Sequence, residues 1–186
     1  MHGILPTPST EENYNACDYG NILYYANTQY IACGALIGFN PSSKRVDAFT
    51  LCPESDVWRA MLSELSAGAF LTCAQRDTAC NCNWMLPAGS ADANCASCQL
   101  TLLIPQLEIP ENVKLWHKAE VAKRRELIQH LRLGLPVASI NVTPLGLGFK
   151  FMASLPGKTI LTGYEDRFIT LNISEADDSE PHYTTN

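Results

Sequence analysis

The sequence lacks the features that would place it in a membrane or on a nucleic acid. None of its apolar runs approaches the ~20 residues of a membrane-spanning helix, so we expect no membrane partner. Positive charge is scarce as well: 13 Lys and Arg face 19 Asp and Glu, and the formal net charge is −6. Because a nucleic-acid footprint requires a basic surface, the balance of charge disfavours a nucleic-acid partner. Residues 1–8 show no basic segment followed by an apolar one, so we expect no secretory signal and a cytoplasmic location.

The overall composition predicts an ordinary globular fold. The hydrophobic share is 46% and the charged share is 17%, which is too apolar for a disordered chain. A length of 186 residues suits one medium domain, or a small module joined to part of a second.

What the sequence does contain is a cluster of cysteines in its middle third. A C-x8-C-x12-C-x2-C array is formed by Cys73, Cys82, Cys95 and Cys98. The last pair can bind one ion from a single turn, and the first pair can complete a tetrahedral four-thiolate site from a second loop. We therefore predict one structural Zn²⁺ ion per chain, bound by these four residues. The sequence offers no catalytic residue of comparable clarity.

Two alternatives to this ligand set remain open. Cys80 competes with Cys82, because the two flank Asn81 and would share one face of an extended segment. The cysteines could instead form disulfides, since eight cysteines allow 105 pairings. A metal site is favoured because there is no export signal and disulfides rarely persist in a reducing cytosol. Five of the eight cysteines also lie between Cys73 and Cys98, as metal ligands tend to cluster.

The hydrophobic pattern predicts a mixture of helices and strands. A long helix is expected from Pro110 to Leu133, with Gly134 and Pro136 as its stop and a solvated basic run at 123–125. Apolar residues at helical spacing between Pro53 and Gly68 predict a second, shorter helix. Strands are expected at 22–25, 30–32, 46–51, 149–152, 159–162 and 168–173, with a turn at 163–167 before the last.

Several longer motifs resemble those of a known family. They are Cys82-Asn83-Trp84-Met85-Leu86-Pro87, Cys95-Ala96-Ser97-Cys98, the run from Leu115 to Val137, Leu161-Thr162-Gly163, and the run from Ile169 to Asp178. With the segments around Tyr25 and Cys33, the similarity covers roughly residues 16–180. The chain resembles the bacterial zinc-binding metallopeptidases, which are zincin-like proteins with an N-terminal zinc-ribbon region.

The first half of the ribbon departs from the pattern that the resemblance implies. In the family this half carries two Cys-x-x-Cys knuckles, and the corresponding positions here are occupied by Ala16, Tyr19, Tyr30 and Cys33. Cys17 lies one residue out of register. A phenol cannot replace a thiolate on zinc without a large loss of affinity, so we expect no metal at this first site.

The second departure concerns catalysis. A zincin binds its catalytic zinc through an H-E-x-x-H motif, in which two histidines share a helix face and the glutamate activates water. The histidines of this chain are His2, His117, His130 and His182, and none has that spacing. The resemblance places the motif after the acidic segment Glu175–Asp178, and the sequence runs only to Asn186. We expect this chain to lack the catalytic helix, either as a truncated relative or as a fragment.

The expected fold class is α+β. It comprises an N-terminal zinc-ribbon-like β module with a four-cysteine zinc lobe, one long helix and a small C-terminal sheet. The expected boundaries are a flexible tail at 1–15, a zinc-ribbon-like region at 16–104, an incomplete zincin-like domain at 105–180 and a tail at 181–186.

Three functions are compatible with this reading of the sequence. The preferred one is a catalytically inactive zinc-binding protein with a structural or an interaction role, for which an unknown protein partner is possible. The second is the N-terminal portion of an active zinc peptidase. The third is a zinc ribbon that binds nucleic acid or protein.

Overall fold

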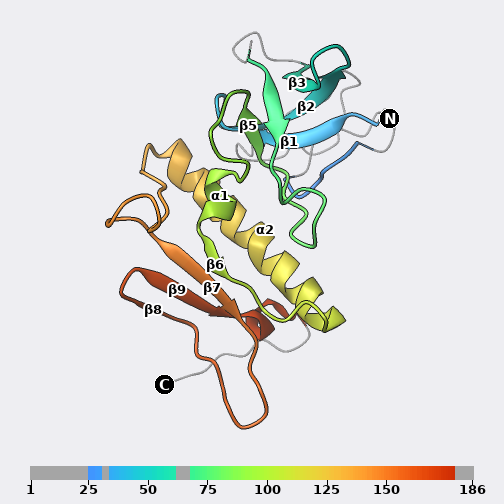
Figure 1. The fold of residues 1–186 in the computed structure, drawn as a ribbon. Coiled ribbons are helices and arrows are strands. Elements are labelled where there is room, and N and C mark those ends of the chain that lie inside the picture. Colours follow the sequence, from blue (N-terminus) through green and yellow to red (C-terminus); the bar gives the residue numbers. More distant parts are fainter. Residues whose placement is uncertain (1–24, 31–33, 62–67, 179–186) are drawn as a thin grey trace, which may run out of the picture.

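The structure, a computed structural model, describes residues 25–30, 34–61 and 68–178. Its elements form two sheets, with one long helix running diagonally between them (Figure 1). The expected tails at 1–15 and 181–186, and most of the strands expected at 22–25 and 30–32, lie outside the described residues. Within the described part, the mixed α and β content, the small C-terminal sheet and the cysteine lobe confirm the predicted fold class.

The first sheet is antiparallel throughout, with the strands in sequence order. It comprises β1 (Leu36–Asn40), β2 (Arg45–Cys52), β3 (Val57–Ala60), β4 (Phe70–Thr72) and β5 (Met85–Pro87). The turn between β1 and β2 is fixed by Asn40, whose Oδ1 accepts hydrogen bonds from the backbone N–H groups of Ser42 and Ser43. Inside the sheet, Phe49 and Phe70 pack edge to face with ring centroids 5.5 Å apart.

The helix expected after Pro53 is wrong over the described part of that segment. Residues 57–60 form β3, which pairs with β2 from Phe49↔Ala60 to Cys52↔Val57. A tight turn closes this hairpin: the backbone N–H of Asp56, at φ 50°, donates to the carbonyl of Cys52. Apolar residues three and four apart fit a helix, but hairpin closure and the pairing of Trp58 with Phe70 favour the strand.

The long helix is confirmed as α2 (Pro110–Arg132). Pro110 occupies its first turn, where the missing N–H costs nothing, and Glu111 complements the positive end of the helix dipole. The helix ends in a Schellman motif, in which Gly134 at φ 75° donates to the carbonyl of Leu131 and Leu135 donates to that of His130.

The second sheet lies on the other side of α2 (Figure 1) and has the order β6-β7-β9-β8. Its strands are β6 (Thr101–Leu103), β7 (Gly148–Met152), β8 (Gly163–Glu165) and β9 (Phe168–Asn172). The strands β6, β7 and β9 run parallel, and β8 is antiparallel to β9. The 3₁₀ helix η2 (Ile173–Ala176) follows β9.

The strands expected at 149–152 and 168–173 are confirmed as β7 and β9, but the one expected at 159–162 is wrong. The strand that pairs with β9 is β8, in the segment that was expected to be the turn. The chain reverses at Asp166 and Arg167, both with positive φ, which is the twist that a two-residue hairpin turn requires.

One hydrophobic core joins the two halves of the molecule. It includes Trp84 beside β5, Trp116 and Leu127 on α2, and Phe149 and Phe151 on β7. Five buried cysteines belong to the same core: Cys73, Cys80, Cys82, Cys95 and Cys98. Among the described residues, no helix combines the length and the hydrophobicity that crossing a membrane requires.

Candidate metal centre

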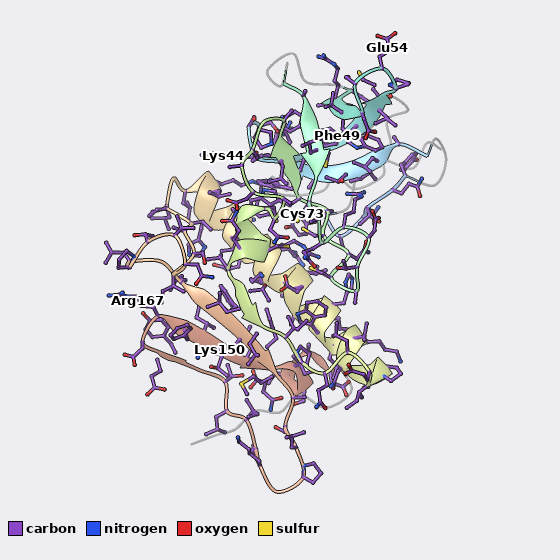
Figure 2. The ribbon with its side chains drawn as sticks, in the orientation of Figure 1. Lys44, Phe49, Glu54, Cys73, Lys150 and Arg167 are labelled. Carbon is purple, nitrogen blue, oxygen red and sulfur yellow. The ribbon has the colours of Figure 1, made fainter. Side chains whose placement is uncertain are left out.

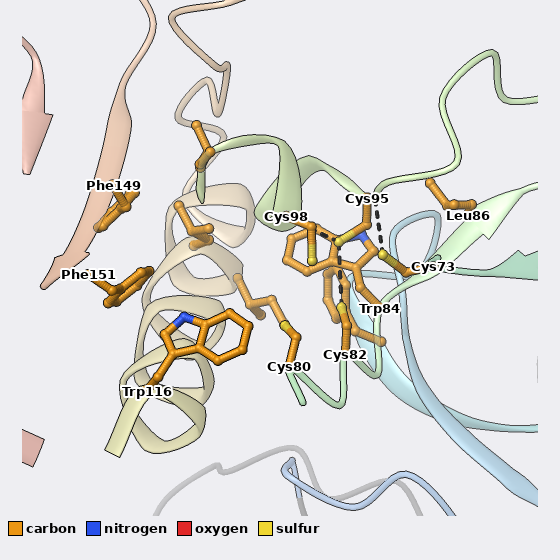
Figure 3. Packing of buried hydrophobic residues seen from close by; sticks show 14 of the residues in the cluster. Cys73, Cys80, Cys82, Trp84, Leu86, Cys95, Cys98, Trp116, Phe149 and Phe151 are labelled. Carbon is orange, nitrogen blue, oxygen red and sulfur yellow. Dashed lines mark hydrogen bonds between the residues drawn. The ribbon is translucent and has the colours of Figure 1, made fainter. Parts of the chain in front are cut away.

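Four cysteine sulfurs meet at the junction between the first sheet, α2 and the short helix α1 (Ala96–Gln99) (Figures 2 and 3). The Sγ atoms of Cys73, Cys82, Cys95 and Cys98 all lie within 4.8 Å of one another. These are the residues expected from the sequence. Their side chains are almost fully buried, with exposed fractions between 0% and 9%.

The spacing of the sulfurs fits a tetrahedral zinc ion. With Zn–S bonds of about 2.3 Å, the sulfurs of a regular tetrahedron are about 3.8 Å apart. The Sγ atoms of Cys82 and Cys95 are 3.6 Å apart, close to that value. A set of four thiol donors also selects a soft or borderline ion such as Zn²⁺ over a hard cation. The residues present therefore fit zinc.

The first two cysteines come from the irregular connection between β4 and β5, and the last two from the end of the connection after β5 and the helix that follows it. Cys73 directly follows β4, and Cys82 lies shortly before β5. Cys95 is the N-cap residue of the short helix α1 (Ala96–Gln99), which also contains Cys98. The two connections are held together by a backbone hydrogen bond from Ala74 to Ala93, at 2.9 Å.

Backbone N–H groups already point at the sulfurs. The N–H of Cys98 donates to Sγ of Cys95 at 3.4 Å, and the N–H of Cys95 donates to Sγ of Cys73 at 3.3 Å. Such hydrogen bonds stabilise negative charge on sulfur and orient the ligands around a metal. Both bonds are drawn in Figure 3.

Strand β1 packs against the segment between Cys82 and β5. The N–H of Phe39 donates to the carbonyl of Asn83 at 2.8 Å, and the rings of Phe39 and Trp84 meet edge to face at 4.4 Å. This close approach requires glycine at position 38, because a Cβ there would lie 2.7 Å from the Asn83 oxygen.

Cys80 is equally buried but lies outside the group of four. Its sulfur accepts a hydrogen bond from Nη1 of Arg124 at 3.5 Å, and its carbonyl lies 3.3 Å from Nδ1 of His117. The segment is not extended at this point, because Asn81 adopts a left-handed conformation with φ 46°. Cys80 and Cys82 therefore do not share the common face that was considered for them.

The thiols titrate unequally because they are crowded together. Hydrogen bonds from Cys82, Cys95 and Cys98 hold the pKa of Cys73 far below its usual range. Burial raises the pKa of Cys95, and hydrogen bonding with Cys73 is the main cause of the raised pKa of Cys98. Four thiolates cannot coexist here without a cation, and a divalent ion would supply the missing positive charge. All six described cysteines are free thiols.

A buried ionic group on α2 lies beside the cluster. Oε2 of Glu120 is 2.9 Å from Nζ of Lys123 and 3.7 Å from Nη1 of Arg124, and all three side chains are at most 2% exposed. Lys123 also donates to the carbonyl of Ser97, between the cysteines of α1. Burial disfavours the charge on Arg124, but the nearby Cys82, Cys80 and Glu120 outweigh that effect and raise its pKa.

The solvated position expected for residues 123–125 is therefore wrong for two of the three, and only Arg125 is exposed. The signal that sequence reasoning missed is Glu120, which lies three and four residues before the two cations. All three side chains fall on the stripe that carries Trp116 and Leu127.

The remaining candidates are not brought to this centre. Of the degenerate first ribbon site only Tyr30 is described, whereas Ala16, Tyr19 and Cys33 lie outside the described residues. His130 faces Glu126 on the surface of α2, with Nδ1 3.3 Å from Oε1. His2 and His182 also lie outside the described residues.

Comparison with known proteins agrees with this geometry. A family model for a zinc-ribbon domain matches residues 13–109, so the fold and the sulfur cluster together define a zinc-ribbon protein. A second model, described as "Putative zinc-binding metallo-peptidase", matches residues 112–185. The chain belongs to the zinc-ribbon family, and the region that follows the ribbon is similar to the zinc-binding metallo-peptidases that the second model describes.

Two relatives are uncharacterized proteins of Mycobacterium bovis and Mycobacterium tuberculosis. Each is 28% identical over 167 residues, which are 89% of this chain and 44% of the relative. The chain therefore spans less than half of the length of these relatives. No solved structure matches it.

Proposed function

We propose that the chain is a zinc-binding protein in which one Zn²⁺ ion stabilises the fold and performs no catalysis. The proposed ligands are Cys73, Cys82, Cys95 and Cys98. The observation that carries this proposal is the mutual approach of their sulfurs to within 4.8 Å in a buried position.

The structural role follows from the number of ligands. A catalytic zinc keeps one coordination position open for water or substrate, whereas four thiolates fill a tetrahedral shell. The four side chains also belong to the hydrophobic core and are at most 9% exposed, which limits the access of water to the ion. When bound, the zinc supplies a cross-link between the connection after β4 and helix α1.

Metal analysis of the purified protein tests the proposal. We expect one zinc per chain, and a loss of that zinc in Cys95→Ser or Cys98→Ser. Cys52→Ser is the matched control, since Cys52 ends β2 and does not belong to the group of four. No bound zinc in the parent chain would reject the proposal, and two zinc ions would contradict a single site.

A second candidate function is that of one part of an active zinc peptidase. It is favoured by the match of residues 112–185 to the peptidase family and by the greater length of the relatives. In that case catalysis requires a second metal bound by other residues, because the four-cysteine site has no free position. Reading the gene past codon 186 for an H-E-x-x-H motif separates the two functions, because the second requires such a motif. A casein-hydrolysis assay of this chain should show no zinc-dependent cleavage.

A reducing compartment such as the cytoplasm suits either function. Thiols must stay reduced to bind zinc, and every described cysteine is a free thiol. Detection of the protein in an oxidising compartment with its cysteines paired would contradict this part of the proposal.

A further inference from the structure

A buried arginine lies in the connection that joins the first two cysteines of the cluster. Arg76 follows Cys73 by three residues, and its backbone N–H donates to the Cys73 carbonyl at 2.9 Å. Its side chain turns away from solvent and is only 8% exposed. An arginine buried to this degree normally has a charged partner.

Only one side of this guanidinium is occupied. Nη2 donates to the backbone carbonyls of Thr28 and Ile37, which anchor it beside β1. Nη1 is buried and has no hydrogen-bond acceptor among the described residues. No described carboxylate lies within ion-pair distance of it. Leaving a buried charged donor without a partner destabilises the folded protein, so an acceptor that reached Nη1 would be stabilising.

Arg76 lines a cavity of about 270 Å³ on the surface of the first sheet. The residues that line it include the apolar Leu36 and Trp58 and the polar Gln29 and Asn81. The volume is slightly below the usual range for drug-sized ligands, so it suits a molecule of amino-acid size.

The charges around the cavity favour a singly charged anion. Burial lowers the pKa of Arg76, and the nearby Asp77 partly offsets that effect. Asp77 is exposed and also lines the cavity, so it would repel a doubly charged phosphate more strongly than a carboxylate. A carboxylate is also the planar partner that a guanidinium matches best.

We propose that this cavity binds the carboxylate group of a small organic acid, with Arg76 as the anion-binding residue and Trp58 and Leu36 as the apolar wall. This site is distinct from the four-cysteine cluster, although the two share one connection. Both Arg76 and Asn81 lie between Cys73 and Cys82. A zinc ion bound by these two cysteines would therefore also hold the backbone of the carboxylate site in position. Binding of an acid is measured on the zinc-loaded protein, so its readout is separate from the zinc content.

Calorimetry on the zinc-loaded protein tests the site with N-acetyl-leucine, which combines a carboxylate with an apolar side chain. N-acetyl-leucinamide, the neutral isostere, is the matched ligand control. We expect saturable binding of the acid and affinity for the amide lower by about tenfold or more, the value of one hydrogen bond to a charged group. Equal binding of acid and amide, or no saturable binding of the acid, would overturn the proposal, as would phosphate competing better than the acid.

Protein variants locate the binding. Arg76→Lys keeps the positive charge but loses the planar guanidinium with its paired N–H donors, and should weaken binding by about tenfold. Arg59→Lys, at an exposed position of β3, should leave the affinity unchanged. Asp77→Asn removes a repelling charge at an exposed position and should tighten binding a few-fold. Unchanged affinity in both Arg76→Lys and Asp77→Asn would place the acid elsewhere and reject the site. Because Asp77→Asn does not disturb a buried contact, it remains informative if Arg76→Lys folds poorly.

The carboxylate could belong to a free acid or to the C-terminus of a peptide. Acetyl-Ala-Ala-Leu carries the same terminal group on a longer chain. Tighter binding of this peptide than of N-acetyl-leucine would assign the site to peptide C-termini. Equal or weaker binding would assign it to small acids.

Discussion

Cys95 makes contact with each of the other three cysteines at the cluster. Its N–H donates to the Cys73 sulfur, its own sulfur accepts from the N–H of Cys98, and that sulfur lies 3.6 Å from Cys82. It is also fully buried. The position of one residue thus sets the spacing of the whole array, and serine, with its shorter bond to oxygen, cannot reproduce that spacing.

At the same scale, zinc affinity should rise with pH. The pKa values of Cys95 and Cys98 are raised, the first mainly by burial and the second mainly by hydrogen bonding with Cys73, so both thiols hold protons at neutral pH without metal. Zinc must displace those protons, and each proton released makes the affinity rise about tenfold per pH unit. Competition with a chelator of known affinity, from about pH 6 to about pH 8, measures the slope. A pH-independent affinity would contradict the raised pKa values.

Glu120 should be far more important for stability than an ordinary surface glutamate. Glu120→Gln leaves Lys123 and Arg124 buried without their counter-ion and should cost about 3–5 kcal/mol in free energy of unfolding. Urea denaturation of the zinc-loaded protein measures this cost. The control is Glu126→Gln, on the same helix but 71% exposed, which should change stability by less than about 0.5 kcal/mol. Similar losses in the two variants would mean that the buried group is hydrated in solution.

Residue chemistry explains why the cysteine cluster could be anticipated and its surroundings could not. The spacing of Cys95 and Cys98 dictates a turn that points two sulfurs at one place, so the pattern is visible in the sequence. The separation of Cys80 from Cys82 depends on the left-handed backbone of Asn81, which its amino-acid type permits but does not require. The charges of Lys123 and Arg124 suggested a surface, because their neutralisation by Glu120 becomes evident only when the helix is packed.

At the scale of elements, α2 ends where it does because of Gly134. With φ at 75°, this residue lies in a region that costs an L-residue about 1 kcal/mol or more. Gly134→Ala should therefore lower the free energy of unfolding by about 1 kcal/mol, as measured by urea denaturation. Gly163→Ala is the control, since an added Cβ there meets no atom within 4 Å and φ is not positive. A neutral Gly134→Ala would mean that the helix end rearranges without strain.

Two of the strands that the sequence did not predict share one cause. Both β3 and β8 are short strands that depend on a hairpin turn with positive φ at Asp56, or at Asp166 and Arg167. Neither turn contains a glycine, so the usual signal for such a turn is missing. The helix α2, in contrast, has its start, its apolar stripe and its stop in its own residues, and it was predicted nearly to the residue.

At the scale of the whole molecule, the zinc site should stabilise both halves together. The four cysteines belong to the same hydrophobic core as Trp116 and Leu127 on α2 and Phe151 on β7. We expect removal of zinc by a chelator to increase amide hydrogen exchange in α2 and β7 as well as in residues 70–100. Mass spectrometry after exchange, with zinc added back as the control, measures this coupling. Faster exchange confined to residues 70–100 would show that the two halves unfold independently.

The position of β6 has a consequence for dividing the protein. The two family matches meet between residues 109 and 112, yet β6, at 101–103, pairs with β7 beyond that boundary. A fragment cut at the boundary would leave one edge of β7 bare, beside the aromatic rings of Phe149 and Phe151. Exposed strand edges next to apolar side chains promote self-association. The region matched by the second family model is therefore shorter than the complete second sheet. That sheet begins with β6, the strand that directly follows the helix containing Cys98.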